Sequence, residues 1–443
     1  MPIQYQSQRL MRQRRKAALK RRRIAILDIG STKIACMILQ LSPELRSEPI
    51  GVRDAHAFYE LYRVIGVATT RSRGIRFGEI CTMDEAERAI RTAISGAQKM
   101  AQTRVDHVIA CFSGGLPQSF SVSGRTELGG GSVTESDIGR VLGSCESPER
   151  NASREAIHAM PVNFQVDDRS ELVDPRGLTG SHLSVDTHLL TIQGQALTNL
   201  QLCIRQCDLE IAGVAFAGYA SGLASLVDDE REFGAVCVDL GGGSSTVSIF
   251  LKNHMIFADS VRLGGSHITS DISKGLQIPF EVSERIKTLH GGVTVTGADD
   301  REMIELVSSD DADRDYRRVS RAELIGVIKP RMEEILEEVR SRMENGGFGH
   351  LPSRRIVLTG GGSLLHGLDR LAARVLGQEV RLGRPLRIAG LPQAASGPAF
   401  SATVGLTLHT VLPQDECWDF HAPDLALDGL SFGNMVRWLR ENW

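Results

Sequence analysis

Two stretches of the chain, far apart in the sequence, share an arrangement of residues that suits phosphate binding. In "RRIAILDIGSTKIACMILQL", residues 22–41, an apolar run ends at Asp28, a glycine and two hydroxyl residues follow, and a second apolar run begins near Ile34. In "FGAVCVDLGGGSSTVSIF", residues 233–250, Asp239 stands in the same place before three glycines and two serines. Small residues let several backbone N–H groups converge on one phosphate, and a carboxylate can hold a hydrated magnesium ion. The pattern therefore favours binding of ATP with Mg²⁺.

Each stretch is predicted to form a β-hairpin whose turn contacts phosphate. Such a turn joins strand to strand, unlike a dinucleotide-binding loop, whose glycines open a helix, and the chain has no Gly-Lys dipeptide for a Walker A loop. One copy alone could be a plain hairpin, but two copies indicate an internal duplication with the nucleotide between the halves. The predicted phosphate-binding residues are Gly30, Ser31, Thr32, Lys33, Gly241, Gly242, Gly243, Ser244 and Ser245, with Mg²⁺ held through water at Asp28 and Asp239.

A third motif suggests where the adenosine lies. "RRIVLTGGGSLLHGLDRLAARVL", residues 354–376, reads as a strand, three glycines and an amphipathic helix, which allows close approach by an adenine-ribose unit. In "FEVSERIKTLHG", an acid and a lysine one helical turn apart could face the ribose, although such a pair is often a solvated salt bridge. The predicted adenosine-binding residues are Glu284, Lys287, Gly360, Gly361, Gly362 and Ser363.

The bulk composition narrows the function classes. The chain has 443 residues, enough for two or more domains, and a formal net charge of −3, so no nucleic-acid partner is expected. Eight scattered cysteines lack the spacing of a zinc site and are typical of reduced thiols in the cytosol. The uncharged stretches 211–227 and 388–414 are rich in Gly, Ala and Ser, which favours buried helices over membrane spans. No secretion signal is recognised, because the apolar run after the basic start is cut short by Asp28.

The two ends of the chain are unusual. Residues 1–23 contain nine Lys and Arg and no Asp or Glu, and are predicted to be a basic disordered arm that is either solvated or attracted to anionic lipid. The last residues, "SFGNMVRWLRENW", form an amphipathic pattern typical of an interfacial membrane anchor, with docking on a protein as the alternative. The predicted membrane-binding residues are Phe432, Met435, Val436, Arg437, Trp438, Leu439, Arg440 and Trp443.

The three nucleotide motifs, in this order, resemble the actin, DnaK-chaperone and sugar-kinase superfamily. Further segments, "RVIGVATTRSRGIRFGEICTMDEA", "VRLGGSHITSDISKGLQIPFEVSERIK" and "IVLTGGGSLLHGLDRLAARVLGQEVRLGRP", are similar to the bacterial cell-division family FtsA. The likeness runs from about Arg23 to Leu412 and includes the C-terminal tip. It implies an α/β, actin-like two-lobed ATPase fold of duplicated ribonuclease-H-like domains, with an FtsA-type subdomain 1C in place of 1B.

The resemblance also implies a division of the chain into subdomains. A helix "MDEAERAIRTAISGAQKMAQ" and a strand "VDHVIACFSG" are assigned to subdomain 1C, together with the helix "TESDIGRVLGSC". The expected ranges are 24–79 and 184–230 for 1A, 80–183 for 1C, 231–268 and 322–411 for 2A, 269–321 for 2B, 412–428 for a linker and 429–443 for the membrane-targeting helix.

The partners and activity implied by the resemblance are those of a membrane-attached scaffold. Subdomain 1C would contact the next subunit of a filament, and 2B would bind the C-terminal tail of FtsZ, with Arg317, Arg318 and Arg321 as candidates unless this charge run is simply solvated. The protein would lie on the cytoplasmic face of the inner membrane at the division site and meet other division proteins. Ala217 stands where actin relatives place a water-positioning glutamine, so ATPase activity is expected to be weak or absent. A soluble phosphotransferase and a PilM-like pilus assembly ATPase are the alternatives.

Overall fold

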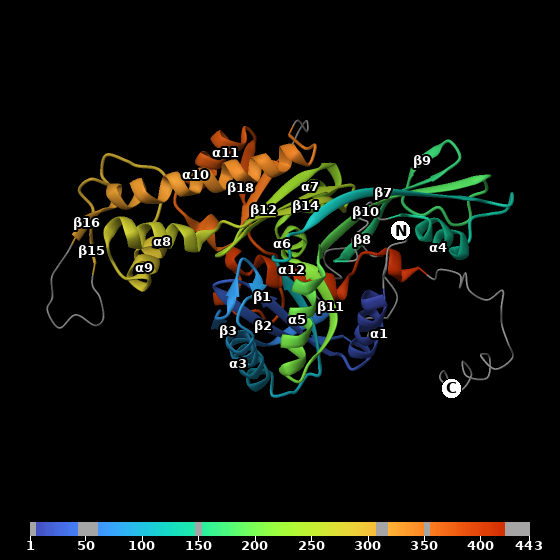
Figure 1. Cartoon of the computed structure of the whole chain (residues 1–443), viewed down its shortest axis with the longest axis horizontal. Helices are drawn as coiled ribbons and strands as arrows, with labels where there is room; N and C mark the ends of the chain where they lie inside the picture. Colours follow the sequence, from blue (N-terminus) through green and yellow to red (C-terminus); the bar gives the residue numbers. More distant parts are fainter. Residues whose placement is uncertain (1–5, 43–60, 147–152, 307–317, 350–354, 421–443) are drawn as a thin grey trace.

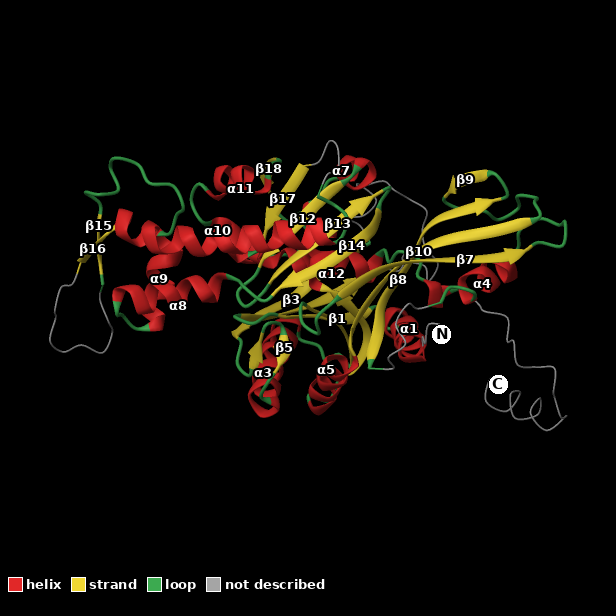
Figure 2. Ribbon diagram, turned by 45° about the horizontal axis from the view of Figure 1, so that its top comes forward, coloured by secondary structure: helices red, strands yellow, loops and turns green. Residues whose placement is uncertain are grey.

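Two five-stranded sheets, one from each half of the chain, form the centre of the molecule (Figures 1 and 2). The structure is a computed structural model that describes residues 6–42, 61–146, 153–306, 318–349 and 355–420. The first sheet has the order β11-β6-β1-β2-β3, and the second has the order β18-β17-β12-β13-β14. In each, an antiparallel meander of three strands is extended by two strands parallel to its first strand. This repeated topology confirms the predicted duplicated α/β fold.

The strands are apolar runs bounded by polar turns, as the sequence pattern predicts. Both hairpin strands of the first sheet are buried on both faces, because helices cover the sheet on either side. The strands of the two sheets are β1 (Arg23–Ile29), β2 (Lys33–Leu41), β3 (Tyr62–Arg71), β6 (His107–Phe112), β11 (Glu210–Phe216), β12 (Ala235–Leu240), β13 (Ser245–Leu251), β14 (His254–Val261), β17 (Arg355–Thr359) and β18 (Glu379–Leu382).

Two uncharged helices, α6 (Ala217–Ser225) and α12 (Ser401–Val411), cross between the sheets and are buried along their whole length. The stretch 211–227 is therefore a strand followed by a helix, β11 and α6, and the stretch 388–414 contains α12. In the part of the chain that the structure describes, no helix is long and apolar enough to cross a membrane.

The inserted subdomain is smaller than predicted. It is a four-stranded sheet of order β7-β10-β8-β9 with a short helix on one face. Its elements are β7 (Gln118–Glu127), α4 (Glu135–Gly143), β8 (Arg154–Val166), β9 (Arg169–Leu172) and β10 (His182–Gln193). The predicted range 80–183 is wrong at its start, because β6 pairs with β1 and β11 in the first sheet. It also ends too early, because β10 pairs with β7 and β8 through Thr191 and Gln193.

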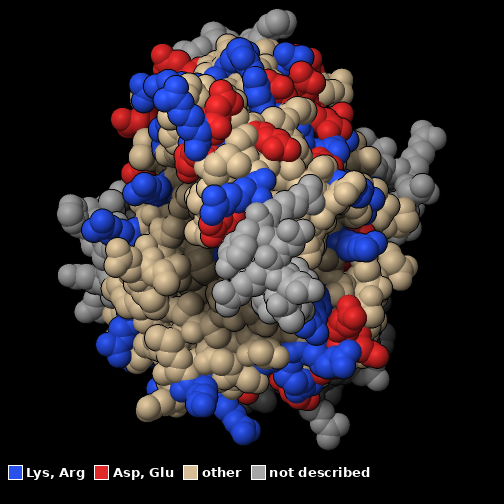
Figure 3. All heavy atoms as spheres, turned by 90° about the vertical axis from the view of Figure 1, so that its left-hand side faces the viewer, with Lys and Arg blue, Asp and Glu red and all other residues tan. Residues whose placement is uncertain are grey.

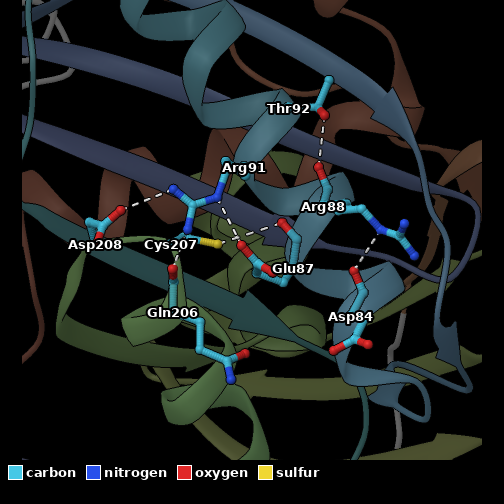
Figure 4. Close-up of polar contacts among 8 residues, drawn as sticks. All are labelled: Asp84, Glu87, Arg88, Arg91, Thr92, Gln206, Cys207 and Asp208. Atoms are coloured by element: carbon cyan, nitrogen blue, oxygen red, sulfur yellow. Dashed lines mark hydrogen bonds and ion pairs between the residues drawn. The ribbon is translucent and has the colours of Figure 1, made fainter.

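Helix α3 (Met83–Ala101) was also assigned to the insertion and instead covers the first sheet. Its buried residues pack on β2 and β3, where a Cβ at Gly66 would lie 2.3 Å from the carbonyl oxygen of Ala97. Arg91 of α3 donates to Glu87, to the carbonyl of Gln206 at the end of α5 (Gly194–Gln206) and to Asp208 just beyond it, at 3.0 Å (Figure 4). Amphipathic periodicity predicts this helix correctly but cannot indicate which sheet it covers.

The second lobe carries an extension at the far end of the molecule from the insertion (Figure 1). Helices α8 and α9, the hairpin β15–β16 and the first part of α10 build it, and the range 269–321 assigned to subdomain 2B stays a prediction. The remaining elements are β4 (Ile75–Arg76), β5 (Glu79–Ile80), α7 (Asp228–Phe233), α8 (Gly265–Leu276), α9 (Phe280–His290), β15 (Met303–Glu305), β16 (Arg318–Ser320), α10 (Arg321–Asn345) and α11 (Leu368–Leu376).

The basic N-terminal segment is not a disordered arm. Residues Gln6–Lys20 form helix α1, which packs on β11. Met11 and Ala18 are buried, and Gln8 donates a buried hydrogen bond to the carbonyl of Ala156 in the insertion. Among the many cations of this segment, the residues that face inward recur at helical spacing. Their contacts with the rest of the protein keep the helix ordered.

The predicted linker 412–428 begins too early. Residues Cys417–Asp419 form a single helical turn against β8, with Trp418 buried. Just before it, the carboxylate of Glu416 accepts hydrogen bonds from His158 and from the backbone N–H of Ala159. Residues 421–428 of that range and the amphipathic segment 429–443 lie outside the described residues.

Candidate functional site

A cavity of about 350 Å³ lies where the β1–β2 turn faces the β12–β13 turn. This volume is in the range of small-molecule sites. Most of the residues predicted to bind a nucleotide line it, namely Asp28, Gly30, Ser31, Thr32, Lys33, Asp239, Gly241, Gly242, Gly243, Ser244, Glu284, Lys287, Gly360, Gly361 and Gly362. The hydroxyls of Ser245 and Ser363 are turned away, and donate to the carbonyls of Leu263 and Gly360 respectively.

The two turns have the same local geometry. Asp28 pairs with Ala35 across one hairpin, and Asp239 pairs with Thr246 across the other. A Cβ at Gly30 would lie 2.8 Å from the carbonyl oxygen three residues later, and a Cβ at Gly241 would lie 2.6 Å from its counterpart. Both first glycines are therefore required by the shape of the turn.

The second and third glycines of the β12–β13 turn let the two turns touch. A Cβ at Gly242 would lie 2.2 Å from Cγ2 of Thr32, and one at Gly243 would lie 2.5 Å from Cβ of Ser31. Side chains here would hold the lobes apart. The backbone N–H groups of both turns are thus gathered around one small volume, as binding of a polyphosphate requires.

Each aspartate is held by a hydroxyl from a crossing helix. Thr403 of α12 donates to Asp28 at 2.7 Å, and Ser221 of α6 donates to Asp239. Desolvation raises the pKa of Asp239 to about 6, and the negative charge of Asp28 adds to this effect. Sequence reasoning did not find the two hydroxyl residues, because they come from the ends of the two halves.

Lys33 lies close to both aspartates and is partly buried. Burial lowers its pKa, while the charges of Asp28 and Asp239 oppose that shift. Its ammonium donates to the carbonyl of Ala399 at 2.6 Å and lies 3.3 Å from the centre of the Phe400 ring. Lys33 therefore brings a positive charge to the cavity. Its ammonium group is held by Ala399 and Phe400, which belong to the other lobe.

The predicted acid and lysine of α9 form more than a solvated salt bridge. The Lys287 ammonium donates to Glu284 at 2.6 Å, to the hydroxyl of Thr269 at 2.7 Å and to the carbonyl of Gly265 at 3.0 Å. Only 13% of the lysine side chain is exposed. The pair therefore fixes α9 against the start of α8 and presents the Glu284 carboxylate to the cavity.

One further side chain indicates that the cavity suits a polar ligand. Thr246 is one of the residues that line the cavity, and its hydroxyl is buried with no hydrogen-bond partner among the described residues. Buried polar groups are nearly always paired, so a ligand or its hydration water is the natural partner. Together with the glycine turns and two aspartates, this hydroxyl fits a nucleotide with hydrated Mg²⁺. Ala217 also lines the cavity and offers only a methyl group.

The three arginines proposed for partner binding differ in their environments. Arg321 forms a 2.5 Å ion pair with Asp299, donates to the carbonyl of His290 and is only 19% exposed, so it holds the extension together. Arg318 is more exposed and pairs with Glu305 across the β15–β16 hairpin at 2.8 Å. Arg317 lies outside the described residues.

Two sheets of one topology, each presenting an Asp-Gly turn to a shared cleft, define the class of actin-like ATPase-fold proteins. Solved structures agree on the fold. A chain of the PilM-PilN type IV pilus biogenesis complex matches with a TM-score of 0.58 and 15% identity, over 88% of this chain and 98% of that chain. MreB5 of Spiroplasma citri bound to ADP matches with a TM-score of 0.51 and 12% identity, over 87% of this chain and 95% of that chain.

Within this class, the chain belongs to the FtsA family of cell division proteins. It is 38% identical over 428 residues to cell division protein FtsA of Agrobacterium fabrum, with 95% of each chain covered, and 27% identical over 398 residues to that of Escherichia coli K12, with 88% of this chain and 90% of the relative covered. The family model of cell division protein FtsA matches residues 236–405. The model of the SHS2 domain inserted in FtsA matches residues 114–191, which agrees with the observed insertion rather than the range 80–183.

Proposed function

We propose that the protein binds ATP with Mg²⁺ between its lobes, assembles into filaments and attaches FtsZ to the cytoplasmic face of the inner membrane at the division site. The observation that carries nucleotide binding is the cleft itself, in which two glycine turns touch beside two aspartates and a buried unpaired hydroxyl. The backbone amides of both turns would hold the phosphates. Asp28 and Asp239 would orient the hydrated ion that supplies charge neutralisation to the phosphates.

The same cleft favours a scaffold with slow turnover over a phosphotransferase. Within the described residues, its carboxylates are Asp28, Asp239 and Glu284. Two of these accept hydrogen bonds from helix hydroxyls and the third is paired with Lys287, so each already has a structural partner. Phosphoryl transfer to a hydroxyl also needs a base close to the acceptor. Because Ala217 cannot orient water, bound ATP would chiefly hold the two turns, and therefore the two lobes, together.

The extension of the second lobe supports attachment of a peptide. Figure 3 views this end of the molecule, where side chains of both charges are interspersed with uncharged surface. Leu289, Val295 and Met303 are each at least half exposed there, and Arg318 lies on the neighbouring strand. Exposed apolar groups beside a cation suit a peptide that carries both apolar and acidic residues, and we assign the FtsZ tail to this surface.

The amphipathic pattern of residues 429–443 supports membrane attachment, and a vesicle experiment tests it. The intact chain and a chain truncated before Asp428 are sedimented with vesicles that contain anionic lipid, with and without ATP. We expect the intact chain to pellet far more than the truncated chain, and more of it with ATP, because a short helix binds weakly unless many copies act together. Val436→Glu should reduce pelleting and Asn434→Glu, on the polar side, should not. Equal pelleting of intact and truncated chains would contradict the anchor.

A further inference from the structure

Helix α1 has two faces that differ in what they contact. Its inward residues recur at helical spacing and touch the first lobe and the insertion, whereas its outward residues are exposed. The inward set includes Gln8, Met11, Arg15 and Ala18, and the outward set includes Arg9, Gln13, Lys16 and Lys20. The outward set follows the spacing i, i+4, i+7, i+11, so its side chains form one row along the helix.

The cations of the inward side are all engaged. Arg15 donates to the carbonyls of His409 and Thr410 at 2.6 and 2.7 Å, and its burial lowers the pKa of its guanidinium to about 10. Arg12 pairs with Asp419 at 2.5 Å and donates to the carbonyl of Trp418. These arginines attach α1 to the end of α12 and to the segment after it. Both guanidinium groups are therefore occupied by contacts within the folded protein.

The cations of the outward row have no such role. Arg9, Lys16 and Lys20 are exposed, and no hydrogen bond or ion pair is formed by them with any other described residue. The row extends over about 16 Å, at 1.5 Å per residue. Like charges at i, i+4 destabilise a helix, and residues 1–23 offer no acid to offset them. A row of this kind is stabilised when an anionic surface lies against it.

The row also lies beside the place where the described chain ends. Arg12, which holds Trp418 and Asp419, is one helical turn from both Arg9 and Lys16. From there the sequence needs only nine residues, 420–428, to reach the amphipathic segment, and nine extended residues span at most about 30 Å. Any surface bound by that segment is therefore within reach of α1.

We propose that the outward row of α1, formed by Arg9, Lys16 and Lys20, docks on an anionic lipid bilayer and fixes the orientation of the molecule on it. The inference rests on the proposed membrane attachment and adds a second, electrostatic contact to it. A bilayer fits better than an acidic protein, because the row is a line of flexible point charges with the half-exposed Leu10 beside it and is not shaped as a pocket. With two contacts, the inserted subdomain that α1 touches is held at a defined height above the membrane.

The experiment compares two charge-matched variants of the full chain. Arg9→Gln/Lys16→Gln/Lys20→Gln removes the row, and Lys274→Gln/Arg370→Gln/Arg384→Gln removes three exposed cations of the second lobe. Glutamine has a helix propensity close to those of Lys and Arg, so α1 should remain folded. Binding is measured on vesicles of phosphatidylcholine alone and on vesicles with 30% phosphatidylglycerol, at low and at high salt.

We expect the row variant to lose affinity only for the anionic vesicles, by on the order of 10- to 100-fold at low salt, because each cation near such a surface contributes roughly 1 kcal/mol. The second-lobe variant should bind as the unchanged protein does. Equal binding by all three proteins would overturn the proposal while leaving the C-terminal anchor intact. Loss on both kinds of vesicle would also overturn it, because it would assign α1 a structural role.

The chain truncated before Asp428 separates this inference from the proposed function. On vesicles of pure phosphatidylglycerol at low salt, the truncated chain should retain weak, salt-sensitive binding that the row variant abolishes. If the intact chain binds the anionic vesicles no better than the truncated chain while this residual binding persists, the anchor is wrong and the row is right. If the row variant instead loses binding to an acidic protein and not to lipid, the partner is a protein and the proposal fails.

Discussion

Gly405 of α12 and Ala220 of α6 lie in direct backbone contact where the two halves of the chain cross. A Cβ at Gly405 would lie 1.6 Å from the carbonyl oxygen of Ala220, so no other residue fits this crossing without separating the helices. The same two helices supply the hydroxyls of Thr403 and Ser221 to the two aspartates. The crossing therefore determines both the packing of the lobes and the position of the carboxylates in the cleft.

The first prediction follows from this contact. Gly405→Ala should lower the free energy of unfolding by at least about 2 kcal/mol, because overpacking a fully buried helix crossing cannot be relieved locally. Chemical denaturation measures the change. Gly326→Ala is the control, since Gly326 lies in helix α10 with no atom within 4 Å of an added Cβ. The control should raise stability by about 0.5–1 kcal/mol, and an equal effect of both variants would contradict the prediction.

The second prediction concerns the titration of Asp239. Its pKa is about 6 in the folded protein against an ordinary value of 3.8, so the folded state binds more protons than the unfolded state between these values. The ionised carboxylate therefore destabilises the nucleotide-free protein above pH 6, and this cost declines as the pH falls through 6. Asp239→Asn should raise the unfolding free energy by on the order of 1–3 kcal/mol at pH 7.5 and by about half as much at pH 5, because the cost disappears only as the pH falls to the ordinary value of 3.8.

The comparison variant for this titration is Asp28→Asn, which keeps the Asp239 carboxylate but removes the neighbouring negative charge that adds to its raised pKa, so the pKa of Asp239 should fall. Denaturation curves at pH 5, 6 and 7.5 give the comparison. A gain from Asp239→Asn that is the same at all three values would show that the effect comes from packing. Affinity for Mg·ATP should fall in Asp239→Asn at pH 7.5, since the variant lacks the charge proposed to orient the hydrated ion.

The third prediction addresses turnover. Ala217 presents a methyl group to the cavity at the start of α6. Ala217→Gln would place an amide there that can orient a water molecule, and we expect ATP hydrolysis to rise by on the order of tenfold. Ala217→Leu adds similar bulk without a polar group and should leave the rate unchanged or lower. Phosphate release measures both, and a similar rise in the leucine variant would refute a water-positioning role.

Much of this site could be predicted from sequence because its motifs are local. The strand, aspartate and glycine turn at Asp28 and at Asp239 follow from a few consecutive residues, and each glycine has a steric reason for its identity. Thr403 could not be found in this way, because it meets Asp28 across 375 positions of the chain. The start and the end of the inserted subdomain, which the predicted range 80–183 placed wrongly, also depend on tertiary contacts. The sequence of α3 does not indicate which sheet it covers, and in α1 the inward Arg15 resembles its exposed neighbours.

The last prediction concerns the buried pair that secures the C-terminal segment. The Glu416 carboxylate accepts from Nδ1 of His158 at 3.0 Å and from the N–H of Ala159 at 2.8 Å, while Nε2 of the same ring accepts from the N–H of Phe216. Burial raises the pKa of this carboxyl group. Glu416→Ala would leave two buried donors unpaired, so we expect a loss of about 2–4 kcal/mol in unfolding free energy.

The same change should release the segment that follows α12 before the whole protein unfolds. Limited proteolysis of Glu416→Ala should cut near Trp418 under conditions in which the unchanged protein resists, because that turn would lose its hydrogen bonds to His158 and Ala159 of β8. Glu337→Ala, on an exposed face of α10, is the control and should alter neither stability nor cleavage. If Glu416→Ala unfolds globally with no early cleavage, the segment is an integral part of the inserted subdomain. Early cleavage with β8 intact is the expected result, and it would show that Glu416 holds the C-terminal segment to the rest of the folded protein.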